Sequence, residues 1–246
     1  MRTKLAKRVN RLEVLLLLAA LIVTAGMLAA PGLAAADTTT LHGSALNSTI
    51  TWGGYTIITG TLTDTTTHTA IGGQSVRVEW SLTGALNSWK LLATVTTDAN
   101  QFYTGQYAAV VYPTQLTWYR FNFLGAPGLD PAPGNSLQVF VKPYLTVPKV
   151  PSSAKVNKKF TVSGTLKPQF PAGQQTVTLV AYRYNGHKWV SYKSYSATNA
   201  NNGSYTKYSA SIKISKAGKY RFKASTATTS KYSATKTANS ATVKIK

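Results

Sequence analysis

The chain has 246 residues, with 27 Lys or Arg against six Asp or Glu, a formal net charge of +21, and no cysteine. The absence of cysteine excludes a disulfide framework, a thiolate metal site and a cysteine nucleophile. Thr, Ser, Val, Tyr and Gly are abundant while Glu is nearly absent, and this composition favours pleated strands over helices.

The N-terminus has the pattern of an export signal. Five Arg or Lys residues in the first eleven precede an apolar stretch of 17 residues, Val14 to Ala30, which Pro31 and Gly32 interrupt. Ala34 to Ala36 supply the small residues of a cleavage site, so we predict a signal peptide over residues 1–36 and a secreted protein. The alternative is a retained membrane anchor, since 17 residues is at the lower limit for spanning a bilayer.

Two similar units of about 100 residues each follow this segment. Constant order at offsets of 100 to 104 residues indicates a duplicated domain, and the matching positions are Ile58-Thr59-Gly60-Thr61-Leu62 with Val162-Ser163-Gly164-Thr165-Leu166, Gly73 with Gly173, Trp89 with Trp189, Tyr119-Arg120-Phe121 with Tyr220-Arg221-Phe222, and Val139 with Val243. Three prolines between residues 143 and 151 suit a stiff linker. We therefore predict domains over residues 37–143 and 144–246.

Apolar residues alternate with polar ones within each unit. Around Tyr208 to Ile214 and Tyr220 to Ala224 the period is two, which predicts strands with one buried face. Asn185-Gly186 is typical of a two-residue hairpin turn, and Thr97 to Asn100 predicts a turn in the first unit. About seven strands per unit predict an all-β fold of two tandem immunoglobulin-like sandwiches, with a closed barrel as the alternative.

The phrases ITGTLTD, GGQSVRVEW, WKLLATVTTDANQFY, VSGTLKP and KAGKYRFKA carry a family resemblance. They resemble the immunoglobulin-like repeat domains of secreted cell-surface proteins of Gram-positive-type bacteria. The resemblance covers roughly residues 48–246, and the Asp98-Ala99-Asn100 turn here lacks the glycine usual in the family. It implies adhesion, spacing or wall association, and it implies no catalytic residue.

The two units differ sharply in charge. Residues 37–143 hold four basic and five acidic residues, whereas residues 144–246 hold 18 basic residues and no Asp or Glu. Cations without internal partners attract external anions. Alternation points Lys219, Arg221 and Lys223 outward, and Lys207 and Lys213 outward on the preceding strand, so neighbouring strands would form a basic ladder on one face.

We therefore predict that the second unit binds an anionic polymer of the cell envelope, such as a wall polymer, an acidic polysaccharide or extracellular DNA. The predicted contacts are Lys155, Lys158, Lys159, Lys207, Lys213, Lys219, Arg221 and Lys223. Lysines that only solvate the surface and protect strand edges are the alternative.

Candidate catalytic and metal sites are weak. Asp64 and His68 share one loop, which favours a polar turn over an acid–base pair, and the clustered aspartates of a calcium site are missing. No phosphate-binding glycine loop is present, because Gly53-Gly54 and Gly72-Gly73 are typical of turns. We expect no enzymatic activity, no cofactor and no metal.

The tryptophans divide by the repeat. Trp89 and Trp189 occupy equivalent positions, so we expect both in the hydrophobic cores. Trp52, Trp80 and Trp118 have no counterpart in the second unit and are candidates for a carbohydrate or partner surface. A carbohydrate-binding accessory module is therefore the alternative function.

Overall fold

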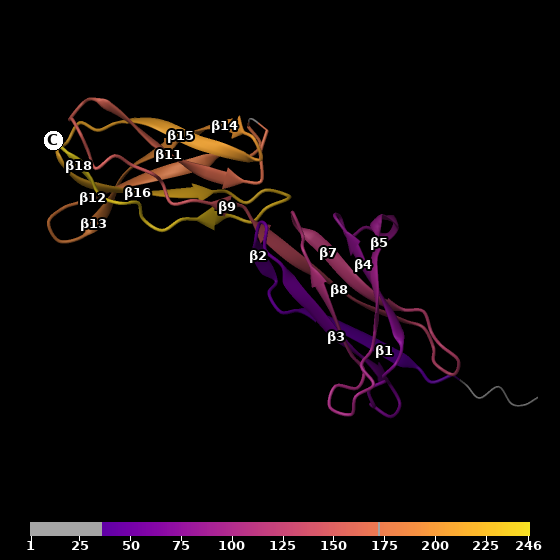
Figure 1. Ribbon diagram of the computed structural model, residues 1–246. Helices are drawn as coiled ribbons and strands as arrows, with labels where there is room; N and C mark the ends of the chain where they lie inside the picture. Colours follow the sequence, from indigo (N-terminus) through magenta and orange to yellow (C-terminus); the bar gives the residue numbers. More distant parts are fainter. Residues whose placement is uncertain (1–35, 172) are drawn as a thin grey trace, which may run out of the picture.

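The computed structural model describes residues 36–171 and 173–246, and it is built from strands around two hydrophobic clusters (Figure 1). The predicted signal peptide, residues 1–36, lies outside the described residues except for Ala36. Within the described ranges no helix is long and apolar enough to cross a bilayer. The chain is all-β, and its paired sheets have the arrangement of immunoglobulin-like sandwiches.

The N-terminal half, residues 37–143, contains two facing sheets. The first has the order β1-β3-β6, formed by β1 (Thr39–Ala45), β3 (Thr56–Asp64) and β6 (Gln106–Val111). The second has the order β2-β8-β7-β4-β5, formed by β2 (Thr49–Thr51), β8 (Ala132–Lys142), β7 (Thr117–Phe123), β4 (Ser75–Ser81) and β5 (Lys90–Thr96). A short 3₁₀ turn, Leu86–Ser88, precedes β5.

The C-terminal half, residues 144–246, repeats this plan. One sheet has the order β14-β15-β11-β9, from β14 (Thr198–Asn202), β15 (Tyr205–Lys213), β11 (Lys159–Lys167) and β9 (Tyr144–Leu145). The other has the order β10-β18-β16-β12-β13 with β17 also on β16, from β10 (Ser153–Ala154), β18 (Val243–Ile245), β16 (Gly218–Thr226), β12 (Val177–Tyr184), β13 (Trp189–Ser196) and β17 (Thr235–Lys236).

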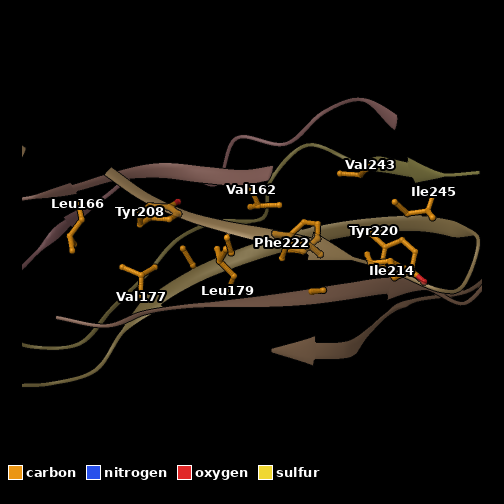
Figure 2. Packing of buried hydrophobic residues seen from close by; sticks show 14 of the residues in the cluster. Val162, Leu166, Val177, Leu179, Tyr208, Ile214, Tyr220, Phe222, Val243 and Ile245 are labelled. Carbon is orange, nitrogen blue, oxygen red and sulfur yellow. The ribbon is translucent and has the colours of Figure 1, made fainter. Parts of the chain in front are cut away.

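Each half has its own core, produced by the alternation along its strands. In β16 the residues Tyr220, Phe222 and Ala224 are fully buried, and the intervening residues point outward. Figure 2 shows Tyr220 and Phe222 among the buried side chains of β11, β12, β15 and β18. The core of the N-terminal half is assembled in the same way around Phe121 and Phe123. Because most of the long strands in both halves bury one face, hydrophobic burial is the main stabilising term.

A glycine–tyrosine device recurs in both halves. The hydroxyl of Tyr107 donates to the carbonyl of His42 at 2.8 Å, and that of Tyr208 donates to the carbonyl of Thr146 at 2.8 Å. Each ring lies over a glycine in the neighbouring strand, Gly60 or Gly164, where a Cβ would come within 2.2 Å of the hydroxyl oxygen. The glycine of the repeated Gly-Thr-Leu motif therefore leaves the space that the tyrosine ring occupies.

Because of this buried tyrosine, the free energy of unfolding is expected to fall as the pH rises into the alkaline range. Burial raises the pKa of Tyr208 to about 12, above its ordinary value of 10.0. The unfolded chain then loses the phenol proton before the folded chain does, so this contribution is complete below pH 10 and is lost between pH 10 and 12. We expect Tyr208→Phe to flatten the fall in the free energy of unfolding across that window, measured by urea denaturation. Equal pH profiles for the two proteins would contradict this expectation, and the titration of lysines is common to both.

Three connections join the two halves. The Leu116 amide donates to the Lys231 carbonyl at 2.8 Å, and the Ser233 amide donates to the Val141 carbonyl at 2.9 Å. Tyr232 packs against both hydrophobic clusters. Because Tyr232 packs against both clusters, residues 37–246, which carry every strand that the structure describes, are the unit to be tested.

The predicted hairpin turn is one residue out of place. The Asn185 amide donates to the Lys188 carbonyl at 3.1 Å, so the two loop residues are Gly186 and His187, not Asn185 and Gly186. Gly186 takes a φ of 105°, which a side chain would disfavour. The Asn185 side chain accepts the amides of His187 and Lys188 instead. Asparagine therefore shapes this turn from its flank.

Candidate functional site

The predicted basic ladder across β15 and β16 does not form. β15 pairs with β11 and β14, whereas β16 pairs with β12, β17 and β18 in the opposite sheet. Lys207 and Lys213 therefore face away from one side of the sandwich, and Lys219, Arg221 and Lys223 from the other. The short link between the strands crosses from sheet to sheet, which alternation within each strand does not indicate.

The fold gathers a different set of lysines at the end of the C-terminal half farthest from the N-terminal half. β11 runs from this end at Lys159 to the junction, where Lys167 pairs with Tyr144. Lys159 pairs directly with Lys213, and Lys219 pairs directly with Lys244. All the members are exposed lysines, and we call them the distal basic end: Lys155, Lys158, Lys159, Lys213, Lys216, Lys219, Lys244 and Lys246.

Backbone hydrogen bonds hold these segments together. The Asn157 amide donates to the Ile214 carbonyl at 2.9 Å, which joins the loop of Lys155 and Lys158 to the end of β15. The Val156 amide donates to the Lys246 carbonyl at 2.6 Å. The Tyr220 hydroxyl donates to the Lys216 carbonyl at 2.9 Å and anchors the link between β15 and β16. The lysine backbones are thus fixed while their ammonium groups remain in solvent.

Two like-charge pairs mark this end as electrostatically unfavourable by itself. Lys159 lies opposite Lys213 on one sheet, and Lys219 lies opposite Lys244 on the other. Like charges directly opposite each other on paired strands destabilise a sheet.

In the described residues, the ion pairs are Arg77–Glu79 at 3.3 Å and Arg120–Glu79 at 2.7 Å, both in the N-terminal half. The distal basic end therefore has no carboxylate side chain of its own to offset its charge.

Arg221 shows how the two halves treat the same position. Arg120 in the N-terminal half lies 4.4 Å from the ring of Trp89 and binds the buried carboxylate of Glu79. Arg221 lies 4.4 Å from the ring of Trp189, but Tyr182 occupies the position of Glu79 and Thr242 Oγ1 accepts from Arg221 Nε at 3.1 Å. The cation–aromatic stack is kept and its counterion is lost, so Arg221 stays available to an external anion.

This stack also corrects the expectation that Trp89 and Trp189 lie in the cores. Both are half-buried, and they cover the arginines on the outer sheet faces. The repeat correctly predicts that the two tryptophans share one role. It does not tell whether that role is packing in a core or stacking on an arginine at the surface.

The remaining predicted cations lie away from the distal basic end. Lys207 pairs with Thr165, six residues along β15 from Lys213, which corresponds to roughly 20 Å. It shares a hollow of about 250 Å³ with Lys149. Lys223 lies 5.8 Å from the ring of Tyr182, farther along the outer face of β16. Of the eight predicted residues, the fold brings Lys155, Lys158, Lys159, Lys213 and Lys219 together.

Sequence reasoning missed Lys216 and the pairing of Lys244 with Lys219. Val243 and Ile245 alternate inward, so Lys244 points outward from a strand that pairs with β16. In an immunoglobulin-like sheet the last strand runs beside this one. The predicted fold therefore already contained the signal for Lys244.

The three tryptophans proposed for a carbohydrate surface do not converge. Trp80 packs toward the core of the N-terminal half, and Trp118 lies against Gly84 on the outer sheet face. Trp52 lines a groove of about 740 Å³ between the halves, together with Tyr55 and Tyr144. Trp80 also lines a separate hollow of about 310 Å³, so Trp52 and Trp80 border different hollows.

The loop of Asp64 and His68 is a structural turn. Asp64 Oδ1 accepts the amides of Thr66 at 2.7 Å and Thr67 at 2.9 Å. These bonds, that of Thr67 foremost, hold the pKa of the Asp64 carboxyl below its usual value. His68 is exposed and takes a φ of 56°. Among the described residues no three His, Cys, Asp or Glu side chains converge as metal ligands.

Comparisons with known proteins include a likeness to a solved structure. No protein-family model matches the chain, and no curated protein does. Among solved structures the chain is similar to the crystal structure of the ICAM-5 D1–D4 ectodomain fragment, at 15% identity and a TM-score of 0.40. The match covers 83% of this chain and 53% of that one, so the chain spans about half the length of the fragment.

Proposed function

We propose that this chain is a secreted, non-enzymatic binding protein of the cell envelope, whose C-terminal half attaches to an anionic polymer through the distal basic end. The observation that carries the proposal is the convergence of eight exposed lysines from three stretches of the chain, residues 155–159, 213–219 and 244–246, in a half that has no Asp or Glu. A wall polymer, an acidic polysaccharide or extracellular DNA would supply the missing negative charge.

The residue types favour attraction without precise recognition. Lysine presents a compact point charge, whereas arginine presents a planar fork suited to bidentate contacts. The C-terminal half contains 16 Lys and two Arg. Each lysine close to an anionic surface adds on the order of 1 kcal/mol, which falls off within a Debye length. Binding through several lysines would therefore be useful but sensitive to salt.

The N-terminal half would act as a spacer or as a module for a further partner. It is close to electrically neutral, with four basic and five acidic residues. The buried carboxylate of Glu79 in this half already pairs with Arg77 and Arg120. This half therefore offers an external polyanion little of the attraction that the distal basic end offers.

Binding to charged and neutral polymers tests the proposal. We expect residues 37–246 to bind double-stranded DNA and polygalacturonic acid, and to release both steeply between about 50 and 200 mM salt. A neutral glucan is the control and should bind weakly at every salt concentration. Failure to bind either acidic polymer at low salt would contradict the proposal.

The groove at the junction supports a second candidate, the carbohydrate-binding accessory module. Trp52, Tyr55 and Tyr144 supply aromatic rings there, and Tyr55 and Tyr144 are 58% and 44% exposed. Stacking on a neutral sugar would change little with salt. Salt-insensitive binding to the glucan that Trp52→Ala abolishes would favour this candidate over polyanion binding.

A further inference from the structure

The outer face of β16 carries a row of cations beside aromatic rings. Lys219, Arg221 and Lys223 lie on this face, because the residues between them are fully buried. On the neighbouring strand β12, Tyr182 pairs with Arg221, and Tyr184 lies two residues farther along on the same face. With the tryptophan that begins β13, these residues form what we call the aromatic basic face: Tyr182, Tyr184, Trp189, Lys219, Arg221 and Lys223.

Arg221 is held in place at the centre of the aromatic basic face. Its guanidinium lies 4.4 Å from the ring of Trp189, and that ring lies 5.4 Å from the ring of Tyr184. Its Nε donates to Thr242 Oγ1 at 3.1 Å. Within the described residues no hydrogen bond or ion pair engages its two Nη groups. The stack and the hydroxyl therefore orient the guanidinium and leave its Nη edge free.

The N-terminal half shows which group completes such a stack. Arg120 lies 4.4 Å from the ring of Trp89, and its Nε donates to the buried carboxylate of Glu79 at 2.7 Å. In the C-terminal half Tyr182 takes the position of Glu79. The same arginine–tryptophan pair thus binds a carboxylate in one half and has none of its own in the other. A carboxylate from outside would complete it.

We propose that the aromatic basic face binds the uronate residues of an acidic polysaccharide, with one carboxylate on the Nη groups of Arg221. The planar fork of arginine matches a carboxylate through two parallel hydrogen bonds. Lys219 and Lys223 lie roughly 7 Å from Arg221 along the strand, where they would attract carboxylates of the neighbouring sugars. This site rests on the proposed function, polyanion binding by the C-terminal half, and narrows the polymer to one with carboxylates on sugar rings.

The aromatic rings favour a sugar acid over other anions. Tyr182 and Tyr184 are half-buried beside the cations and would cover the apolar faces of sugar rings. An acidic peptide offers carboxylates without such rings, and duplex DNA keeps its bases stacked inside. Single-stranded DNA combines rings with charge, but its anion is a phosphate, whereas the carboxylate of Glu79 is the group that the equivalent arginine binds.

Calorimetric titration of residues 37–246 with tetragalacturonate tests the site. At about 150 mM salt, attraction between charges more than about 8 Å apart is largely screened, so direct contacts dominate. We expect Arg221→Lys, which keeps the charge and loses the planar fork, to weaken binding by about 10-fold. Tyr184→Ala, which removes a ring and no charge, should also weaken binding. Both variants should bind duplex DNA at low salt within about twofold of the wild type, because the distal basic end keeps its charge.

The matched control is Arg183→Lys, the same substitution on the opposite face of β12. Arg183 pairs with the buried Tyr220 and donates through Nη2 to the Ala217 carbonyl at 3.2 Å. We expect this variant to bind tetragalacturonate like the wild type. Thermal unfolding of each variant, followed by circular dichroism, confirms that the protein titrated is folded.

Four results would overturn the uronate site and leave the proposed function standing, provided that DNA and polygalacturonic acid still bind at low salt. They are no binding of tetragalacturonate, unchanged affinity in Arg221→Lys or in Tyr184→Ala, an equal loss in Arg183→Lys, and binding of tetraglutamate or of a single-stranded DNA tetramer as tight as that of tetragalacturonate. Absence of binding to every acidic polymer at low salt would instead overturn the uronate site and the proposed function together.

Discussion

Replacing Lys155, Lys158, Lys159 and Lys213 together by glutamine is expected to weaken DNA binding at low salt by about 10²- to 10³-fold, because each lysine near an anionic surface contributes on the order of 1 kcal/mol. Fluorescence anisotropy of a labelled duplex measures the loss. The same variant should unfold at an equal or higher temperature, since the like-charge pair Lys159–Lys213 is removed. Lost binding with retained stability would separate a binding surface from a structural one.

The matched control removes the same charge from the junction side of the C-terminal half. Lys167, Lys207, Lys231 and Lys236 are replaced by glutamine, which leaves the distal basic end intact. We expect this control to lose less than about 10-fold in affinity, because long-range attraction is screened beyond roughly 10 Å in ordinary salt. Equal losses in the two variants would show that net charge alone drives binding, and would contradict the assignment of a site.

Gly164→Ala is expected to lower the free energy of unfolding by about 3 kcal/mol, the upper end for adding a methyl group to a packed core. The new Cβ would lie 2.2 Å from Tyr208 Oη and 2.3 Å from Cζ, and the ring is fully buried. The strand or the ring must move, which also disturbs the bond from Tyr208 to Thr146. Urea denaturation followed by tryptophan fluorescence measures the change.

Ser163→Ala serves as the control for this prediction. Ser163 is the neighbouring residue on the same strand and points to the outer face. We expect its replacement to change stability by less than about 0.5 kcal/mol. A Gly164→Ala protein as stable as this control would show that Tyr208 does not depend on the missing side chain.

The fold was predictable because several local signals agree. The period-two alternation around Tyr220 and Phe222 places those residues in the core, as the structure confirms. The repeated Gly-Thr-Leu segment and the repeated tyrosines mark the same device in both halves, although the sequence does not say that Gly60 and Gly164 make room for a ring. The all-β, immunoglobulin-like prediction is therefore correct.

The site was predictable in composition but not in geometry. The absence of acidic residues after Tyr144 identifies the C-terminal half as the basic one. Alternation places Lys213 and Lys219 on outer faces, but it does not tell whether two consecutive strands pair or lie in opposite sheets. That choice depends on how both sheets cover a common core. Because β15 and β16 lie in opposite sheets, the predicted ladder does not form, and lysines of both sheets meet at the distal basic end instead.

The position of Trp189 was unpredictable for a related reason. Trp189 begins its strand directly after a turn, where the register that decides inward from outward is set by the turn. That turn closes one residue later than the Asn-Gly pattern predicts.

The salt dependence of DNA binding by residues 37–246 tests most directly whether the cations of the C-terminal half rely on an external polyanion. If most of the distal basic end contacts phosphates, the logarithm of the binding constant should fall linearly with the logarithm of salt concentration, with a slope of about −4 or steeper. The quadruple glutamine variant should reduce that slope by about 3 to 4, which corresponds to its four lost lysines. A slope near zero, or the same slope in both proteins, would contradict the account.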